Sequence, residues 1–248
     1  MLLYELRDYI ASLLDVSRFR DYCPNGVQVE GRAEVRRIAS GVTASQRLLQ
    51  AATTWGADAV LVHHGYFWRN EDAAITGIKK QRIAHLLQHD MSLLAYHLPL
   101  DAHIELGNNA QLGQRLGFVQ QGRFGEQDIA CYGELVSAQT LSQLCKTISD
   151  SLQREPQVIG QSDRAIRRIA WCTGAAQGYF EEAVALGVDA FLTGEISEQN
   201  VHVAHETGVA FIAAGHHATE RYGVQALGAH LATQFGTEHR FFDIDNPV

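Results

Sequence analysis

The chain contains two copies of one segment, and this internal repeat restricts the possible folds more than any other feature. The first copy begins at Arg37 and the second at Arg168, an interval of 131 residues (168 − 37), and both begin Arg-Ile-Ala. Gly56-Ala-Asp-Ala in the first copy matches Gly187-Val-Asp-Ala in the second at the same interval, without a gap. A repeat at a fixed interval predicts two related structural units within one chain.

Each copy has the pattern of a β-strand, an α-helix and a second β-strand. Thr, Ser and Gly residues follow the first apolar run and favour a turn or a helix N-terminus. Helical spacing of apolar residues follows, and Gly56 and Gly187 suit the end of that helix, where a left-handed backbone is needed. Such units favour a parallel sheet covered by helices, so we expect an α/β fold. The expected strands are Ile38–Val42 and Ala57–Val62 in the first copy, and Ile169–Cys172 and Val188–Leu192 in the second.

A third apolar strand continues the likeness, although the interval changes there. One of these strands leads to His97 and the other to His216, and each histidine is followed four residues later by a carboxylate, Asp101 or Glu220. We therefore expect two related α/β lobes that arose by internal duplication. The expected domains are 1–125 and 126–248, joined in the polar segment 120–128, with a C-terminal segment able to pack back on the first lobe.

Charge and composition argue against several classes of protein. The formal net charge is −8, whereas a general nucleic-acid-binding protein needs a basic surface. No apolar run is long enough to span a membrane, and Leu2, Leu6, Ile10 and Leu13 predict an amphipathic N-terminal helix rather than a secretory signal. The four cysteines form no Cys-x-x-Cys pair, so we expect buried free thiols and a cytoplasmic location.

Histidines and carboxylates gather where the expected strands end. In an open α/β sheet, ligands bind at the carboxyl ends of the strands, and sites between domains are common. We therefore expect a metal site at the interface of the two lobes. Imidazole and carboxylate donors suit Zn²⁺, Fe²⁺ or Mn²⁺. The candidates are His63, His64, His97 and Asp101 in the first lobe, and Glu195, His216, His217 and Glu220 in the second.

Neighbouring residues of a strand tend to point apart, so His63 and His64 are expected to hold different ions. A carboxylate can bridge two ions roughly 3.5–4 Å apart, which makes Asp101 and Glu220 candidate bridges. His216 would complete a set of three histidines and two carboxylates. Purely structural, hydrogen-bonded histidines are the alternative to metal binding.

Several motifs, in order along nearly the whole chain, resemble the NIF-three-like family. They are PNGVQVEG, GVTAS, GADAVLVHHGYFW, HLPLDAHIELGNNAQLG, TGEISEQ and AAGHHATER. Bacterial members of this family are called GTP cyclohydrolase 1 type 2 homologues. The resemblance implies two related α/β domains that enclose a dinuclear metal centre at their interface, within a toroidal homohexamer. The ligands it implies are His63, His64, Asp101, His216 and Glu220.

The expected function is that of a metal-dependent, GTP cyclohydrolase-like hydrolase that uses two divalent cations per chain. Glu195 corresponds to His64 at the interval of 131 residues and is a candidate proton shuttle, or alternatively a helix N-terminal acid. His97 could move protons too, or it could orient Asp101. The negative net charge counts mildly against a polyanionic substrate such as GTP. A non-catalytic, metal-holding oligomeric scaffold or interaction protein is the alternative function, because the motifs restrict metal binding but not turnover.

Overall fold

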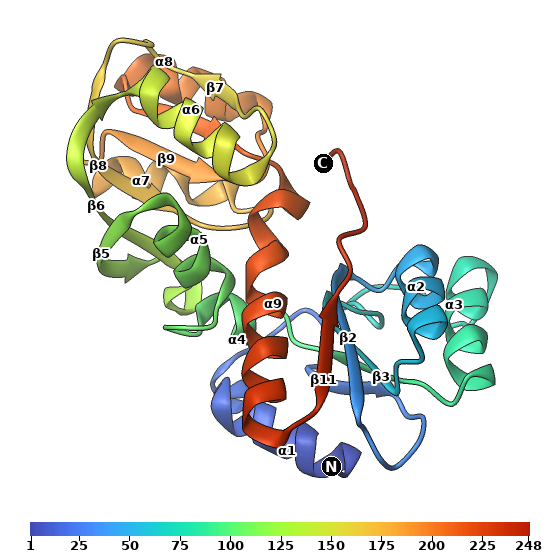
Figure 1. Cartoon of the computed structure of the whole chain (residues 1–248). Coiled ribbons are helices and arrows are strands. Elements are labelled where there is room, and N and C mark those ends of the chain that lie inside the picture. Colours follow the sequence, from blue (N-terminus) through green and yellow to red (C-terminus); the bar gives the residue numbers. More distant parts are fainter. The chain divides into compact units, whose positions relative to one another are not determined.

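Two mixed β-sheets organise the chain, one in each of two structural units, in a computed structural model that describes all 248 residues (Figure 1). Each sheet combines parallel and antiparallel strands and carries helices, so the predicted α/β class is confirmed. Unit 1 comprises Met1–Gly107 and Gly223–Asp245, and unit 2 comprises Asn108–Tyr222 and Asn246–Val248.

The boundaries of these units do not fall between residues 125 and 126, where the sequence predicted the domain boundary. The strands on either side of that point, β5 (Phe118–Phe124) and β6 (Ala130–Thr140), are antiparallel neighbours in one sheet. The polar segment 120–128 therefore forms most of β5 and the connection to β6, and it does not link two domains. The chain instead enters unit 2 after Gly107 and returns to unit 1 within helix α9 (His216–Phe235). Most of the C-terminal segment consequently belongs to unit 1.

The sheet of unit 1 has five strands in the order β1-β4-β3-β2-β11, of which only β1 runs antiparallel to its neighbour. Helices α2 and α3 lie over one face, where Val60 joins a buried apolar cluster with Leu48 (Figure 1). Helix α1 and the later turns of α9 contribute to a second cluster, which includes Leu61. Because both faces are covered, these strands are apolar along nearly their whole length. The remaining elements of unit 1 are α1 (Leu3–Leu13), η1 (Val16–Arg18), β1 (Gly26–Val29), β2 (Arg37–Thr43), α2 (Gln46–Trp55), β3 (Ala59–His64), α3 (Gly77–Gln88), β4 (Ser92–Ala95), α4 (Leu98–Ala102) and β11 (Glu238–Phe241).

The predicted amphipathic N-terminal helix is confirmed as α1, although its buried face differs by one residue from the expected pattern. Leu3, Leu6 and Ile10 are buried, as a spacing of three and four residues allows. Leu2 lies at the N-cap position and its side chain is largely exposed.

The sheet of unit 2 has six strands in the order β5-β6-β8-β9-β10-β7, with a parallel centre formed by β8, β9 and β10. Trp171 belongs to the main apolar cluster of this unit, to which α5 and α6 contribute. Phe180, Phe191 and Phe211 form a separate group of mutually contacting rings. The remaining elements of unit 2 are α5 (Asn108–Leu116), η2 (Glu126–Asp128), α6 (Leu141–Leu152), β7 (Gln157–Ile159), β8 (Ala165–Trp171), η3 (Gln177–Tyr179), α7 (Phe180–Ala185), β9 (Ala190–Thr193), α8 (Glu198–Thr207) and β10 (Ala210–Ala213).

The two predicted strand–helix–strand units are present, and their strand registers match. Ile38 pairs with Ala59 in unit 1, and Ile169 pairs with Ala190 in unit 2. Each residue of the second pair therefore follows its counterpart in the first pair by the interval of the sequence repeat. The two glycines that follow the helices have the predicted left-handed backbone, with φ of 77° at Gly56 and 70° at Gly187. The helix is shorter in unit 2, where η3 replaces its first turn.

An aspartate stabilises the first strand of each copy in the same way. Asp58 Oδ2 accepts hydrogen bonds from the backbone N–H groups of Arg36 and Arg37, at 2.8 and 2.9 Å. Asp189 Oδ2 accepts the equivalent bonds from residues 167 and 168, both at 2.9 Å. The match therefore extends from the sequence repeat to individual hydrogen bonds.

The third strands show where the copies diverge. Ala59 pairs with Ser92 in unit 1, and Ala190 pairs with Ala210 in unit 2, so the interval here is 118 residues (210 − 92). In this register, the equivalent of His97 is Gly215 rather than a histidine. His97 accordingly precedes α4 as its N-cap, whereas His216 is the first residue of α9.

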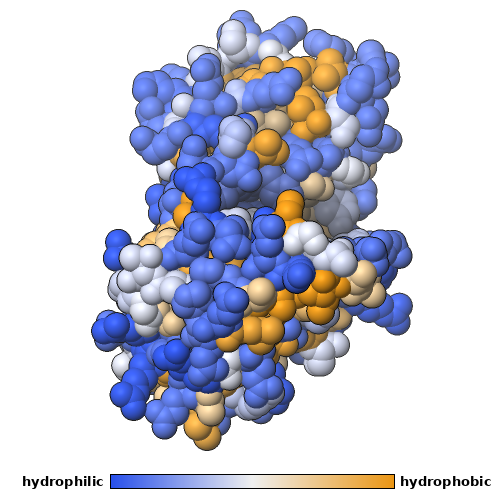
Figure 2. Space-filling model, turned by 90° about the vertical axis from the view of Figure 1, so that its right-hand side faces the viewer, coloured by the Kyte–Doolittle hydropathy of each residue, from blue (hydrophilic) through white to orange (hydrophobic).

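Hydrophilic residues dominate the face that Figure 2 shows, and apolar residues appear there in small groups. This surface agrees with a chain of ordinary composition. None of the helices combines the length and the apolar character that crossing a bilayer requires.

Candidate metal centre

Unit 1 places three imidazole rings side by side where β3 and β4 end. The ring centroids of His63 and His64 are 4.5 Å apart, and His97 lies 4.9 Å from the first and 5.7 Å from the second. The expectation that His63 and His64 point apart is therefore wrong. Alternation along a strand determines only the Cα–Cβ directions, and the side-chain torsions bring both rings together.

A shared feature of these three histidines is that Nδ1 already has a polar partner. The contacts are His63 Nδ1 with the Tyr96 carbonyl at 3.0 Å, His64 Nδ1 with Thr43 Oγ1 at 3.3 Å, and His97 Nδ1 with Asp21 Oδ1 at 2.7 Å. A carbonyl or carboxylate oxygen can only accept a hydrogen bond, so Nδ1 carries the proton in His63 and His97. In the neutral ring, Nε2 then presents its lone pair, which is the form of histidine that binds a metal.

Asp101 supplies a carboxylate to the same group. Its Oδ1 atom lies 3.4 Å from Nε2 of His63, and both side chains are almost completely buried. The backbone N–H groups of Leu100 and Asp101 bond to the His97 carbonyl, so the short helix α4 holds the carboxylate at this end of the sheet. Unit 1 thus brings four of the predicted site residues together.

Unit 2 has a comparable group at the start of α9. His216 and Glu220 are one helical turn apart, and His216 Nε2 lies 3.1 Å from Glu220 Oε2. Glu195 Oε1 lies 2.6 Å from His216 Nδ1 and so holds the other side of the ring. Glu220 is nearly buried, whereas Glu195 is one-third exposed.

The two carboxylates alter the protonation of His216. Burial disfavours its charged form, but hydrogen bonds and Coulombic attraction, first from Glu220 and then from Glu195, outweigh burial and raise the pKa of His216 to about 9. A divalent cation at Nε2 would take the place of the proton there, between an imidazole and a buried carboxylate. The donor set of unit 2 therefore fits a cation of the Zn²⁺, Fe²⁺ or Mn²⁺ type.

Two glycines give this group its space. A Cβ atom on Gly174 would overlap Glu220 Oε1, and φ of 71° at Gly174 also favours glycine. A Cβ atom on Gly194 would lie 2.7 Å from the Cα of His216. Neither glycine stood out as a site residue in the sequence, because its importance depends on a helix that follows later in the chain.

Two further histidines lie near these groups in the sequence. His103 Nδ1 accepts the backbone N–H groups of the residues two and three positions later, which is a structural role. The backbone N–H of His217 bonds to the Val248 carbonyl. The four cysteines are free, as expected, and burial together with Asp21 raises the pKa of the Cys23 thiol to about 12, so it stays protonated at neutral pH.

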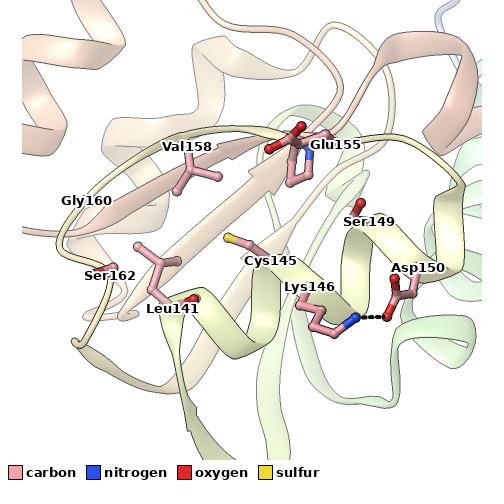
Figure 3. A pocket seen from close by; sticks show the side chains of 11 residues that line it. Leu141, Cys145, Lys146, Ser149, Asp150, Glu155, Val158, Gly160 and Ser162 are labelled. Carbon is pink, nitrogen blue, oxygen red and sulfur yellow. Dashed lines mark hydrogen bonds and ion pairs between the residues drawn. The ribbon is translucent and has the colours of Figure 1, made fainter.

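A separate pocket of about 490 Å³ lies in unit 2 beside α6 and β7. Figure 3 shows Leu141, Cys145 and Val158 on its wall and the ion pair between Lys146 and Asp150 on α6. Burial raises the pKa of the Cys145 thiol to about 11, so the pocket presents no thiolate at neutral pH. None of the predicted site residues lines this pocket.

Comparisons with known proteins agree with the resemblance seen in the motifs. The family model described as Duf34/NIF3 (NGG1p interacting factor 3) matches residues 1–247. A curated Pseudomonas aeruginosa protein named GTP cyclohydrolase 1 type 2 homolog is 56% identical over 238 residues, which cover 95% of this chain and 94% of that protein. The solved structure of protein ybgI, described as of unknown function, is 46% identical with a TM-score of 0.96 and full coverage of both chains. The structure of a Thermus thermophilus protein, TTHA1606, is 32% identical with a TM-score of 0.92, again with full coverage of both. The chain therefore belongs to the Duf34/NIF3 family.

Proposed function

We propose that this protein is a metal-dependent hydrolase that holds two divalent cations. The proposed ligands are His63, His64 and Asp101 of unit 1 and His216 and Glu220 of unit 2. The observation that carries the proposal is an arrangement found in each unit by itself. A histidine Nε2 lies close to a buried carboxylate oxygen, at 3.4 Å in unit 1 and 3.1 Å in unit 2, while Nδ1 has another partner.

This arrangement fits metal ions better than it fits purely structural histidines. In each unit an imidazole nitrogen lies beside an oxygen of a buried carboxylate, and Zn²⁺, Fe²⁺ and Mn²⁺ bind these two types of donor. Partners at Nδ1 orient metal-binding histidines in known sites, and their loss weakens metal binding. Divalent cations would also place positive charge beside the buried carboxylates, at Glu220 in place of the proton that His216 carries without metal.

Bound divalent cations would lower the pKa of water and polarise the bond that is hydrolysed. The protein side chains around them would orient ligands and move protons. Glu195 holds His216 at Nδ1 and, being one-third exposed, can also exchange protons with solvent. In this proposal, Glu195 positions the ligand His216 and can also relay a proton.

The proposed substrate class is a purine nucleotide, because close relatives carry the name GTP cyclohydrolase 1 type 2 homolog. An aromatic side chain lies beside the histidines of unit 1: the Trp68 ring is 5.9 Å from His64 and 5.0 Å from His97. Such a ring offers a surface on which a base can stack. The phosphates would depend on the cations for attraction, since the chain is negatively charged overall.

Metal content and GTP turnover test the proposal together. Protein purified without chelators is expected to contain two metal equivalents per chain by elemental analysis, and His216→Ala and Glu220→Ala are expected to reduce that number. The loaded wild-type protein should open the ring of GTP and release formate, whereas these variants should not. His202→Ala is the matched control, because His202 is exposed on α8 and pairs only with Glu198.

Two other results would change the conclusion. Two bound metals without conversion of GTP by the wild-type protein would remove the cyclohydrolase activity from the proposal. Specific partner capture that depends on Glu220, again without turnover, would favour the non-catalytic scaffold.

We further propose a cytoplasmic homohexamer, as the family resemblance implies, and sedimentation equilibrium showing the mass of a single chain would contradict this assembly.

A further inference from the structure

The loop from β3 to α3, residues 65–76, follows His64 directly and has a strained backbone. Phe67 has φ of 64°, in the left-handed region that a bulky L-residue rarely adopts, and Asn70 has φ of 69°. Trp68 and Arg69 lie between these two residues. Strain of this kind persists only where surrounding contacts determine the conformation, and it is concentrated at active sites and ligand sites. The loop therefore holds Trp68 and Arg69 in positions that a relaxed backbone would not give them.

A lysine on α3 holds the loop in this conformation. The Lys79 side chain is 12% exposed, and its Nζ lies 5.0 Å from the centre of the Phe67 ring and 3.3 Å from Glu71 Oε1. Glu71 Oε2 accepts the backbone N–H of Trp68 at 3.0 Å, and the Trp68 carbonyl accepts the backbone N–H of Glu71 at 3.0 Å. Neither the Trp68 nor the Arg69 side chain takes part in these contacts, so neither is needed to form this turn.

Arg69 is oriented by the segment that contains Tyr22. Its backbone N–H donates to the Tyr22 carbonyl at 2.6 Å, and its Nη2 donates to the Asp21 carbonyl at 2.8 Å. The guanidinium carbon lies 5.4 Å from the centre of the Tyr22 ring. An arginine that is placed over an aromatic ring and bonded at one nitrogen keeps further N–H donors for a ligand and loses little freedom when it binds one.

No carboxylate pairs with the Arg69 guanidinium. The Asp21 carboxylate is the acid next to it in the fold, but its oxygens accept hydrogen bonds from Asn25, His97 and Leu98. Arg69 therefore keeps an exposed positive charge that its neighbours do not balance. Several other arginines of unit 1 each pair with a carboxylate, namely Arg7, Arg32, Arg36 and Arg37.

An aromatic surface and this cation are thus neighbours in the chain, beside the histidines of unit 1. The Trp68 ring contacts His64 and His97, and the Tyr22 ring lies 6.4 Å from that of His97. A nucleotide combines a base, which stacks on aromatic side chains, with phosphates, which arginine binds through charge-assisted hydrogen bonds. The pair Trp68–Arg69 therefore matches the two halves of a nucleotide.

We infer that Trp68 and Arg69 form a nucleotide-recognition subsite in unit 1, in which Trp68 stacks on the base and Arg69, supported by Tyr22, binds phosphate. This inference rests on the proposed function for the class of substrate, and it adds the side chain that recognises the phosphates. It does not require a bound metal. Because stacking does not distinguish one base from another, the subsite prefers nucleotides over nucleosides and does not select guanine over adenine.

Calorimetric titration of the metal-free, full-length protein with GTP and with guanosine tests the role of Arg69. GTP should bind more tightly than guanosine, and Arg69→Gln should weaken GTP binding about tenfold while leaving guanosine binding unchanged. Arg36→Gln is the matched control, because it makes the same change of charge at the opposite end of β2. Arg36 is 81% exposed and pairs only with the exposed Glu34, so its loss should affect neither ligand.

The role of Trp68 gives a different pattern. Trp68→Leu should weaken GTP and guanosine binding by the same factor, about tenfold, because both ligands carry the base. Trp68→Phe keeps an aromatic ring and should restore most of the affinity. ATP should behave like GTP in every variant.

The salt dependence of GTP binding to the wild-type protein is a test that needs no variant. The net charge of −8 repels GTP, so a protein without a local cation should bind GTP more tightly as salt screens this repulsion. With Arg69 in contact with phosphate, the GTP affinity should instead fall as the salt concentration rises. Guanosine is uncharged, and its affinity should not change in the same range.

The outcomes separate this inference from the proposed function. The inference fails if the folded, metal-free protein does not bind GTP, or if Arg69→Gln weakens guanosine and GTP binding equally, which would indicate a role in loop structure alone. It also fails if GTP affinity rises with salt, a result that decides the matter should circular dichroism show that Arg69→Gln does not fold. Binding of GTP that depends on Arg69, together with a metal-loaded protein that leaves GTP intact, would support the inference and remove the cyclohydrolase activity. Turnover of GTP with an unchanged KM in Arg69→Gln would do the reverse.

Discussion

The carboxyl ends of the two sheets have the same framework but different side chains. At the position of His63 in unit 1, unit 2 has Gly194, and at the position of His64 it has Glu195. A Cβ atom at Gly194 would lie 2.7 Å from the Cα of His216, so no imidazole fits there. Unit 2 instead takes its histidine from the first residue of α9 and uses Glu195 to hold the ring.

The comparison shows which parts of a duplicated unit can change. Strand register and the aspartate bonds to the first strand are the same in both units, because a shift of one residue would turn every buried side chain to the other face. The residues after the strands have no such restriction, so each unit has evolved its own donor set. The equivalent aspartates, glycines and histidines therefore offer direct tests of how far the likeness extends.

The largest expected effect comes from the aspartates that hold the first strands. Asp58→Ala should lower the free energy of unfolding by about 4 kcal/mol. It removes the carboxylate that accepts hydrogen bonds from two backbone N–H groups and from the Arg32 guanidinium. Asp189→Ala removes the same two backbone bonds, but its side chain is 30% exposed compared with 12% for Asp58. Water can replace part of what is lost, so we expect about half the effect, measured by urea denaturation.

Equal losses for the two aspartates would contradict this difference in burial. Asp58→Asn is a useful companion variant, since one oxygen can still accept the backbone bonds while the charge is lost. It should retain more stability than Asp58→Ala. A smaller loss for Asp58→Ala than for Asp189→Ala would show that the two strand starts are not held as the hydrogen bonds indicate.

Gly194 tests why unit 2 lacks a histidine at the end of its second strand. Gly194→Ala should destabilise the protein by about 3 kcal/mol, because its Cβ would be too close to backbone atoms that cannot move independently. Gly178→Ala is the matched control, since nothing lies within 4 Å of its Cβ position and its φ is not in the left-handed region. We expect metal binding to fall with Gly194→Ala, as α9 is displaced, and to be unchanged in the control. A neutral Gly194→Ala would mean that packing against α9 does not explain the difference between the units.

Much of the framework could be predicted from sequence, because its causes are local or repeat at one interval. The apolar runs, the glycines after the helices and the interval of 131 residues predicted both strand–helix–strand units with their parallel pairing. The domain boundary was harder to predict. The polar segment near Gly125 looks like a linker, whereas it connects two paired strands of unit 2. The return of the chain to unit 1 inside α9 has no local signal at all.

The site shows a similar division. The residues that follow the strands were predictable from the sheet pattern and from the family motifs. Their orientation was not, because it depends on partners from distant segments. Asp21 lies 76 residues before His97 in the sequence, and Tyr96 contacts the ring of His63 through a backbone carbonyl, which every residue type has. Asp21 lies just outside the PNGVQVEG motif, and no sequence pattern showed that its carboxylate would hold a histidine.

The histidine of unit 2 should make stability depend on pH in the metal-free protein. The folded-state pKa of His216 is about 9, above its ordinary value, so its protonation stabilises the folded state. This contribution is complete below about pH 6.5 and is lost as the pH rises through 9. We expect a decrease of about 2 kcal/mol between pH 6 and pH 10, measured by urea denaturation with a chelator present. The decrease should be absent in His216→Gln, and a profile shared by both proteins would assign it to other groups.

The smallest expected effect concerns the glycines that end the two equivalent helices. Gly56 and Gly187 have nearly the same φ, and a Cβ atom at either would contact only an arginine Nη1, at 3.3 Å in both units. Alanine at each position should therefore cost about 1 kcal/mol, almost entirely from the left-handed backbone. Because packing is so similar, the two losses should agree within experimental error in urea denaturation. A clear difference between the two losses of stability would show that the units differ within the framework itself, and not only in the residues that follow the strands.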